Sequence, residues 1–125
     1  MKLLRLFLAT LVLALTLVAC EKEGLGGKAT ITGHVKHHDT PIPNATVYIK
    51  YGARELPGTD PSDFDAQTVA SSGDGHYEFT DLQKGDYYLF SIGFDSTISE
   101  AVKGGIPVNI NKKSETLEVN IPVTE

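Results

Sequence analysis

The sequence predicts an all-β protein: a single antiparallel Greek-key β-sandwich of about seven strands, preceded by a helical signal peptide. Three observations predict it. Short segments alternate apolar and polar residues with a period of two, which is typical of half-buried strands. Glycine, proline, asparagine and aspartate separate these segments at intervals of roughly ten residues. After the first twenty residues, no segment has the apolar period of a helix.

Residues 1–19 have the pattern of a signal peptide. Lys2 and Arg5 precede an apolar run from Leu6 to Val18, which is shorter than the roughly 20 residues that span a membrane. The run ends in Leu17-Val18-Ala19-Cys20, which resembles the lipobox of bacterial lipoproteins. The resemblance implies cleavage before Cys20, with diacylglycerol and an N-acyl chain on that residue, and two or more acyl chains anchor a protein stably. The alternative is an ordinary secretory signal that ends near a cysteine.

Residues 20–27 are predicted to be a flexible tether, because Glu21 to Gly27 is charged and glycine-rich. The folded domain is expected over residues 28–125. Cys20 is the only cysteine of the chain, so no intramolecular disulfide can form and the core alone must stabilise the domain. About a hundred residues suit one domain with one modest core.

The first four predicted strands follow in order. Residues 29–35 and 45–49 both alternate, and the prolines just ahead of the second strand lie where a missing N–H costs no hydrogen bond of the sheet. Residues 68–70 and 76–79 flank Ser72-Gly73-Asp74-Gly75 and are expected to pair as a hairpin. In the second of them, Tyr77 and Phe79 face the core while His76 and Glu78 face water.

Three more strands complete the prediction. Residues 86–94 are apolar on both faces, with Tyr87 and Leu89 on one face and Tyr88, Phe90 and Ile92 on the other. A strand without alternation is covered on both sides, so this strand is expected to be central. Residues 106–110 and 117–123 form the last two strands, separated by a turn at residues 111–113.

The spacing of several of these residues is specific enough to suggest a family. Gly33-x-Val35, Pro43-x-Ala45-x-Val47 and the longer pattern from Ser72-Gly73-Asp74-Gly75 through Tyr77-x-Phe79 to Gly85-x-Tyr87-x-Leu89 resemble the carboxypeptidase regulatory-like domain, a transthyretin-like (prealbumin-like) sandwich. The resemblance implies an accessory domain without catalytic residues, of the kind found beside peptidases, in bacterial surface proteins and in front of outer-membrane transporters. The His-x-x-Glu zinc motif of the peptidase is absent from this sequence.

The charge of the chain excludes some partners. It has 11 basic and 16 acidic residues, and removal of Lys2 and Arg5 with the signal peptide leaves 9 and 16, a net charge of −7. An acidic body argues against binding to nucleic acid and against electrostatic docking to anionic lipid. The expected partners are a membrane, through the lipid anchor, and an envelope protein or a glycan. Glu21 in place of aspartate after Cys20 favours the outer membrane, with the periplasmic and surface faces both open.

The loop from Gly52 to Asp65 is the predicted contact surface, because recognition often lies in loops on a rigid sandwich. Asp60, Asp63 and Asp65 could offer oxygen ligands to Ca²⁺, with a solvated acidic loop as the alternative. Tyr48 and Tyr51, together with Tyr88, could stack on a sugar or could simply cover the sheet with their rings. The expected function is therefore a non-catalytic accessory module that binds or scaffolds an envelope protein. The alternatives are a surface glycan-binding lipoprotein that serves nutrient uptake and a calcium-binding adhesion module.

Three other patterns suggest chemistry more weakly. A histidine-rich stretch offers transition-metal ligands, with solvated polar residues as the alternative. A lysine on the first strand, an asparagine on the last and an acid between them could form the isopeptide bond of the Gram-positive pilin sandwiches that this fold resembles. Asp95-Ser96-Thr97 is similar to the O-glycosylation triplet of certain bacterial lipoproteins. The residues of the first two patterns are His34, His37, His38 and Asp39, and Lys36, Asn120 and Glu78.

Overall fold

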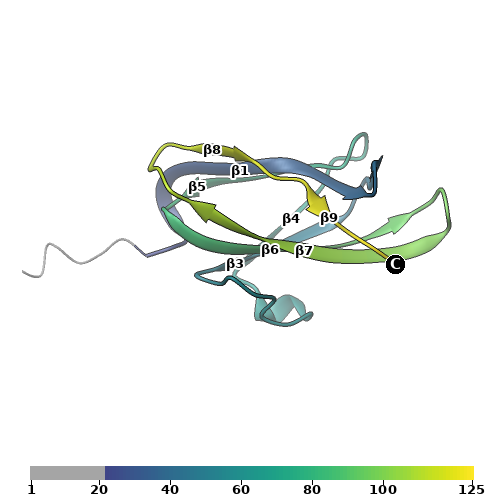
Figure 1. Ribbon diagram of the computed structural model, residues 1–125, viewed down its shortest axis with the longest axis horizontal. Helices are drawn as coiled ribbons and strands as arrows, with labels where there is room; N and C mark the ends of the chain where they lie inside the picture. The colour runs from purple at the N-terminus through teal and green to yellow at the C-terminus, as the bar shows by residue number, and fades with distance from the viewer. Residues whose placement is uncertain (1–21) are drawn as a thin grey trace, which may run out of the picture.

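A computed structural model describes residues 22–125, which form a β-sandwich (Figure 1). The predicted signal peptide and Cys20 lie outside the described residues. Nine strands and one turn of 3₁₀ helix follow in chain order: β1 (Leu25–His37), β2 (Thr40–Pro41), β3 (Thr46–Tyr51), η1 (Pro61–Asp63), β4 (Ala66–Val69), β5 (His76–Leu82), β6 (Gly85–Asp95), β7 (Glu100–Ile110), β8 (Thr116–Glu118) and β9 (Ile121–Pro122). No helix within residues 22–125 is long and apolar enough to cross a membrane.

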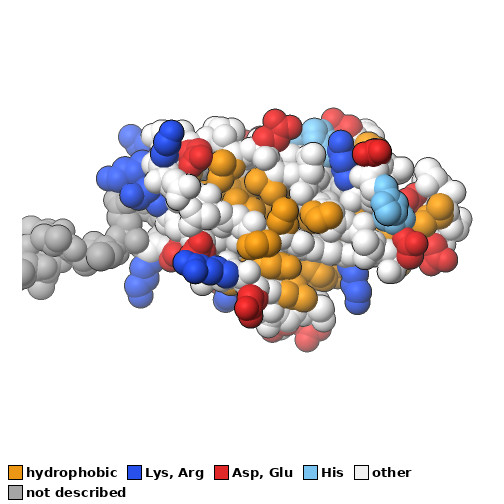
Figure 2. Space-filling view, in the orientation of Figure 1, with side chains coloured by type: hydrophobic (Ala, Val, Ile, Leu, Met, Phe, Trp, Pro, Cys, Tyr) orange, Lys and Arg blue, Asp and Glu red, His pale blue; other side chains and the backbone are white. Residues whose placement is uncertain are grey.

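The strands form two sheets that face each other. One sheet is built on β1, which pairs with β2, β5, β8 and β9, and the other has the order β4-β3-β6-β7. The predicted all-β sandwich is therefore confirmed, and so is the central position of β6 in its sheet. On the face shown in Figure 2, hydrophobic side chains form a band between β8 and β7, where the edges of the two sheets approach each other.

The core lies between the inner faces of the sheets, as the period of two predicts. Alternate residues of β1 and β3 are fully buried, and Tyr77 of β5 is 1% exposed while Glu78 is exposed. The largest side chains of this core are Tyr77, Tyr87, Ile31, Ile42, Ile49, Leu82, Leu89, Ile110 and Ile121.

Strand β1 is paired on both sides, and not all of its pairs are antiparallel. It runs antiparallel to β2 and β5 but parallel to β8 and β9. The sandwich is antiparallel in most of its strand pairs, as predicted, and the parallel pairs of β1 with β8 and β9 are the exception. The chain leaves the other sheet at the end of β7 before it forms β8, so no tight hairpin imposes an antiparallel direction. At the crossing, Gly33 packs directly on the backbone of Val119, since a Cβ on Gly33 would lie 1.8 Å from the Val119 carbonyl oxygen.

The fold begins earlier than the sequence predicts. Strand β1 starts at Leu25, and Gly24 is already buried and fixed by two hydrogen bonds. Its N–H donates to the hydroxyl of Tyr87 over 2.9 Å, and its carbonyl oxygen accepts from the N–H of Gln83 over 2.8 Å. The expected tether over residues 20–27 is corrected accordingly: residues 24–27 belong to the sandwich, because a long-range hydroxyl captures a glycine-rich segment that would otherwise be flexible.

Two further differences concern strand pairing. Residues 68–70 and 76–79 were expected to pair as a hairpin, but β4 pairs with β3 in one sheet and β5 pairs with β1 in the other. The turn at residues 72–75 therefore connects the two sheets. Its glycine, serine and aspartate residues suit such a connection as well as they suit a hairpin turn. Strand β7 begins at Glu100, six residues ahead of the predicted start at residue 106, because it continues the ladder with β6 up to the pair of Asp95 and Glu100.

Candidate binding surface

The outer face of the β4-β3-β6-β7 sheet carries most of the aromatic side chains that lie outside the core. Tyr48 of β3 is directly opposite Phe90 of β6, and Phe90 is opposite Gly105 of β7. Tyr88 follows on the same face of β6, and its ring lies over Gly105: a Cβ there would be 2.6 Å from a ring carbon. We call this surface the aromatic face.

The loop of residues 52–65 folds back onto the aromatic face through Phe64. The ring of Phe64 stacks on Phe90, with centroids 5.7 Å apart and an angle of 4° between the planes, and it lies 5.2 Å from Tyr48. Tyr48 is only 9% exposed and Phe90 only 3%. Part of the aromatic face is thus covered by the chain's own loop, and its rings contribute to packing more than to an open surface.

Farther along the same face, apolar side chains remain open to solvent. Val69 and Ile92 lie on either side of Thr46 in adjacent strands, and Phe94 is two residues beyond Ile92 on β6. Their side chains are 60%, 40% and 55% exposed. We call Val69, Ile92 and Phe94 the apolar patch. Exposed apolar side chains gathered on one face of a sheet are a candidate site for a partner.

The tyrosines predicted to form one stacking platform are separated by the structure. Tyr48 and Tyr51 are three residues apart on β3 and point to opposite faces of the sheet. Tyr51 packs against the core, edge-on to Tyr87, with ring centroids 5.8 Å apart. Of the three, Tyr88 is the half-buried residue whose ring remains on the outer surface. The expected three-tyrosine platform is therefore corrected: of the three rings, only Tyr88 is both partly exposed and on the outer face of the sheet.

Of the three aspartates predicted as calcium ligands, Asp63 and Asp65 accept hydrogen bonds from different backbone groups. The carboxylate of Asp63 accepts a hydrogen bond from the N–H of Asp60 over 3.1 Å, which closes the turn of η1. The carboxylate of Asp65 accepts from the N–H of Tyr51 over 2.7 Å and lies 3.6 Å from the ammonium of Lys50. Within residues 22–125, no group of three His, Cys, Asp or Glu side chains is placed to hold a metal ion. The carboxylate of Asp65 thus fixes the loop to β3, and that of Asp63 fixes the turn within the loop.

The predicted histidine cluster also does not converge. His34 lies 3.2 Å from the carboxylate of Asp74, on the outer face of the other sheet. Asp39 is exposed, and the ring of His38 lies against that of His37, with centroids 4.6 Å apart and the planes tilted by 36°. His37 lies beyond the first predicted strand of residues 29–35, but in the structure it ends β1 and is buried.

His37 forms an ion pair inside the protein. Its Nδ1 lies 2.8 Å from a carboxylate oxygen of Asp95, and both side chains are at most 6% exposed. The other oxygen of Asp95 accepts hydrogen bonds from the backbone and the hydroxyl of Thr97. The Nε2 of His37 is 2.6 Å from Glu125, but the atoms are poorly aligned and this nitrogen has no hydrogen-bond partner. The pair joins the ends of β1 and β6, and thus the two sheets.

The ion pair predicts a specific pH dependence of stability. The hydrogen bond to Asp95 raises the pKa of His37 above its ordinary value of 6.5. The pKa of Asp95 is lowered from 3.8, chiefly by the Thr97 hydroxyl and then by His37. Charged His37 therefore stabilises the fold fully below pH 6.5, and this contribution is lost as the pH rises through the raised pKa. Charged Asp95 contributes above pH 3.8 and loses its effect as the pH falls through its lowered pKa.

We expect the Tm of the wild type to decline above pH 6.5, and His37→Gln to remove that decline while lowering the Tm at pH 6. Thermal unfolding followed by circular dichroism at a series of pH values measures both. His34→Gln is the matched control, since His34 is a half-exposed histidine whose partner, Asp74, lies at the surface. An unchanged pH profile in His37→Gln would show that the pair does not stabilise the fold.

No described hydroxyl donates a hydrogen bond to a histidine; those of Ser71 and Thr97 donate to aspartates. The closest case is Thr32, whose Oγ1 lies 2.7 Å from Nε2 of His76. That hydroxyl donates its one proton to the carbonyl oxygen of Tyr77, so it must accept a hydrogen bond from His76. An imidazole that donates to a hydroxyl cannot remove its proton. This geometry does not support acyl transfer.

The predicted isopeptide residues are likewise not assembled. Glu78 is exposed rather than buried, so it cannot supply the buried acid that the reaction needs. The Asn120 side chain accepts a hydrogen bond from the N–H of His34 over 3.1 Å.

The apolar patch and the role of Phe64 were not predicted from the sequence. The signal for the patch was present, because residues 86–94 are apolar on both faces. That pattern was interpreted as a strand covered on both sides, whereas the structure leaves Ile92 and Phe94 open. Phe64 had no periodic signal, because it stands alone in an acidic loop.

Comparison with solved structures supports the fold. A candidate carbohydrate-binding protein of Pseudomonas aeruginosa aligns with a TM-score of 0.54 and 11% identity, over 80% of this chain and 91% of its own. The major pilin subunit of Bacillus cereus aligns with a TM-score of 0.49 and 14% identity, over 81% of this chain but 30% of its own, so the chain spans under a third of the pilin. No protein-family model and no curated protein matches the chain. At such identities the similarity concerns the β-sandwich alone.

Proposed function

We propose that this chain is a non-catalytic binding module of the bacterial cell envelope, held to a membrane by lipid on Cys20, and that it binds an envelope protein through the apolar patch. The observation that carries the proposal is the exposure of Val69, Ile92 and Phe94, which together leave large apolar surface open on a rigid sheet. Aliphatic and phenyl side chains of this kind fit a protein partner better than a polar ligand.

The position of the patch suits an anchored binder. Gly24, next to the anchored end, is bonded to Tyr87 near the start of β6, whereas Phe94 lies near the end of that strand. The apolar patch is thus at the far end of the sandwich from the point where the chain reaches Cys20. A partner can approach it without contact with the membrane.

The sequence adds two elements to the proposal. The resemblance to the carboxypeptidase regulatory-like domain, which rests on residue spacing, supports an accessory role beside a larger envelope protein. Glu21 after the lipobox cysteine supports the outer membrane as the site of anchoring.

Crosslinking in cells, followed by solubilisation of the membranes, pull-down and mass spectrometry, tests the proposal. We expect one envelope protein in stoichiometric amount, and we expect Phe94→Ala to lower its yield about tenfold, as is usual for loss of a central apolar contact. Leu25→Ala is the matched control, because Leu25 is 68% exposed but lies at the opposite end of the sandwich. Equal yields from the two variants would contradict the assignment of the patch.

Glycan binding is the second candidate. It is favoured by the ring of Tyr88, which is half-buried on the outer face of the sheet, since the open face of an aromatic ring can stack on a sugar. The protein from Pseudomonas aeruginosa that shares the fold is described as a candidate carbohydrate-binding protein. Capture of cell-wall fragments instead of a protein would favour this function. On a glycan array, Tyr88→Ala should then lose the signal and Tyr88→Phe should keep it.

A further inference from the structure

The distance between the sandwich and Cys20 is short. Gly24 is fixed by its hydrogen bonds to Tyr87 and Gln83, so only residues 21–23 separate it from Cys20. An extended chain advances at most about 3.6 Å per residue, which places Gly24 within about 14 Å of Cys20. If Cys20 carries lipid, as proposed above, this end of the sandwich must stay close to the lipid headgroups.

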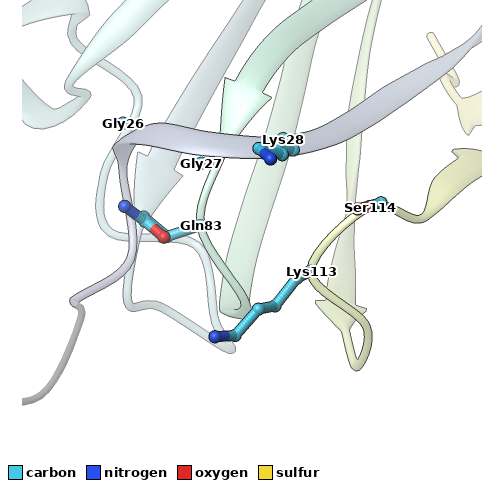
Figure 3. Close-up of a pocket in the computed structure, with 6 residues that line it drawn as sticks. All are labelled: Gly26, Gly27, Lys28, Gln83, Lys113 and Ser114. Atoms are coloured by element: carbon cyan, nitrogen blue, oxygen red, sulfur yellow. The ribbon is translucent and has the colours of Figure 1, made fainter.

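A pocket at this end is lined by hydrogen-bond donors and by no aspartate or glutamate. It has a volume of about 270 Å³ and is lined by Gly26, Gly27, Lys28, Gln83, Lys113 and Ser114. Figure 3 shows the side chains of Gln83 and Lys113 extending from different segments of the chain into the space beside the start of β1. Ammonium and amide N–H groups that face an open pocket suit the oxygen atoms of a phosphate.

The pocket belongs to a basic end of an otherwise acidic domain. Five exposed lysines lie here, and Figure 2 shows a group of Lys and Arg side chains where the described chain begins. These lysines take part in none of the ion pairs found within residues 22–125. We call this part of the molecule the basic end; its lysines are Lys22, Lys28, Lys84, Lys112 and Lys113.

The acidic residues of the basic end are largely engaged. The carboxylate of Glu115 accepts hydrogen bonds from the N–H groups of Asn111 and Lys112, and Asp86 is bound by Arg54 and Asn109. With Glu23 and Asp81, this end has four carboxylates against five lysines. The rest of the described chain has four basic and eleven acidic residues. With Glu21, which lies in the connection to Cys20, this end has five carboxylates for its five lysines, so the net charge of −7 lies on the rest of the domain.

We infer that the basic end docks on the phosphate groups of anionic lipids in the membrane that carries the anchor. This inference rests on the proposed lipid on Cys20. The short connection keeps the lysines near the screening distance of about 10 Å at which a negative surface attracts them, while the acidic remainder is repelled. The domain thus stands upright, with the apolar patch directed away from the bilayer.

Hydrogen exchange of the mature lipoprotein in vesicles tests the docking. One set of vesicles contains phosphatidylglycerol and phosphatidylcholine at about 3:7, and the other contains phosphatidylcholine alone. We expect the amides of residues 26–28 and 112–114 to exchange several-fold more slowly in the anionic vesicles at about 0.05 M salt. Protection should disappear at about 0.5 M salt.

Lys28→Gln with Lys113→Gln should weaken the docking about fivefold for each lysine removed. Lys36→Gln with Lys103→Gln is the matched control, because it changes the net charge equally but away from the pocket. Protection that is equal in both vesicles, or equally reduced by the control, would overturn the inference. The mass of the purified protein reports separately on lipid. Were Cys20 unmodified, the anchoring would be wrong, and the same comparison with vesicles added to the unlipidated chain would still decide the docking.

Discussion

Gly33→Ala is expected to lower the free energy of unfolding by at least about 3 kcal/mol, the upper range for overpacking in a core. The added Cβ would lie 1.8 Å from the carbonyl oxygen of Val119, so the backbone of one segment must move. That movement breaks the parallel pairing of β1 with the C-terminal strands, which includes the hydrogen bond from the N–H of Val119 to the carbonyl oxygen of Thr32. Urea unfolding measures this loss of stability. We expect the transition midpoint to fall while the dependence of the unfolding free energy on urea concentration stays unchanged.

Gly73→Ala is the control for this variant. No heavy atom lies within 4 Å of the position of its Cβ, so the change should stay within about 0.5 kcal/mol. If both alanine variants unfolded at the same urea concentration, the close contact between Gly33 and the backbone of Val119 would not be needed for the pairing of the C-terminal strands with β1.

Tyr87→Ala is expected to cost about 3–5 kcal/mol, the range for removing a fully buried aromatic side chain. The ring of Tyr87 is 0% exposed and lies beside Tyr51 in the core. Its hydroxyl accepts from the N–H of Gly24 and donates to the carbonyl oxygen of Gln83 over 2.6 Å. Since small domains have a total stability of about 5–15 kcal/mol, this variant should be at least partly unfolded at 37 °C.

Tyr87→Phe separates the two roles of that side chain. It keeps the ring and removes the hydroxyl, so we expect a loss of about 1–2 kcal/mol together with faster hydrogen exchange at Gly24. Thermal unfolding and exchange of the two variants give the comparison. Slow exchange at Gly24 in Tyr87→Phe would mean that the hydroxyl does not fix the start of the fold.

The sequence was sufficient for the core but not for every pairing. Alternation in β1 and β3 predicts the buried side chains of Ile31, Val47 and Ile49, because a period of two is a local property of a strand. The turn at residues 72–75 carries no information about which sheet the next strand joins. The parallel direction of β8 depends on contacts between Val119 and Gly33, which are 86 residues apart and have no local signature.

The candidate surface was predictable in part. Residues 86–94 are apolar on both faces, which distinguishes this strand from the others in the sequence. Two residues of the apolar patch, Ile92 and Phe94, belong to it. Tyr48 was singled out as an accessible ring, but Phe64 covers it from a loop. The place where a single aromatic residue of a loop packs depends on the whole tertiary structure, so no spacing rule could have supplied it.

The pairing of the first and last strands has a mechanical meaning. Strand β1 lies parallel to β8 and β9, and the hydrogen bonds between parallel strands are evenly spaced and cross the junction at a slant. A pulling force between a membrane-held N-terminal end and the C-terminal end would slide these strands past each other. All of the bonds across the junction would then bear the load together instead of opening one at a time. A force applied between the two ends would therefore load this junction in shear.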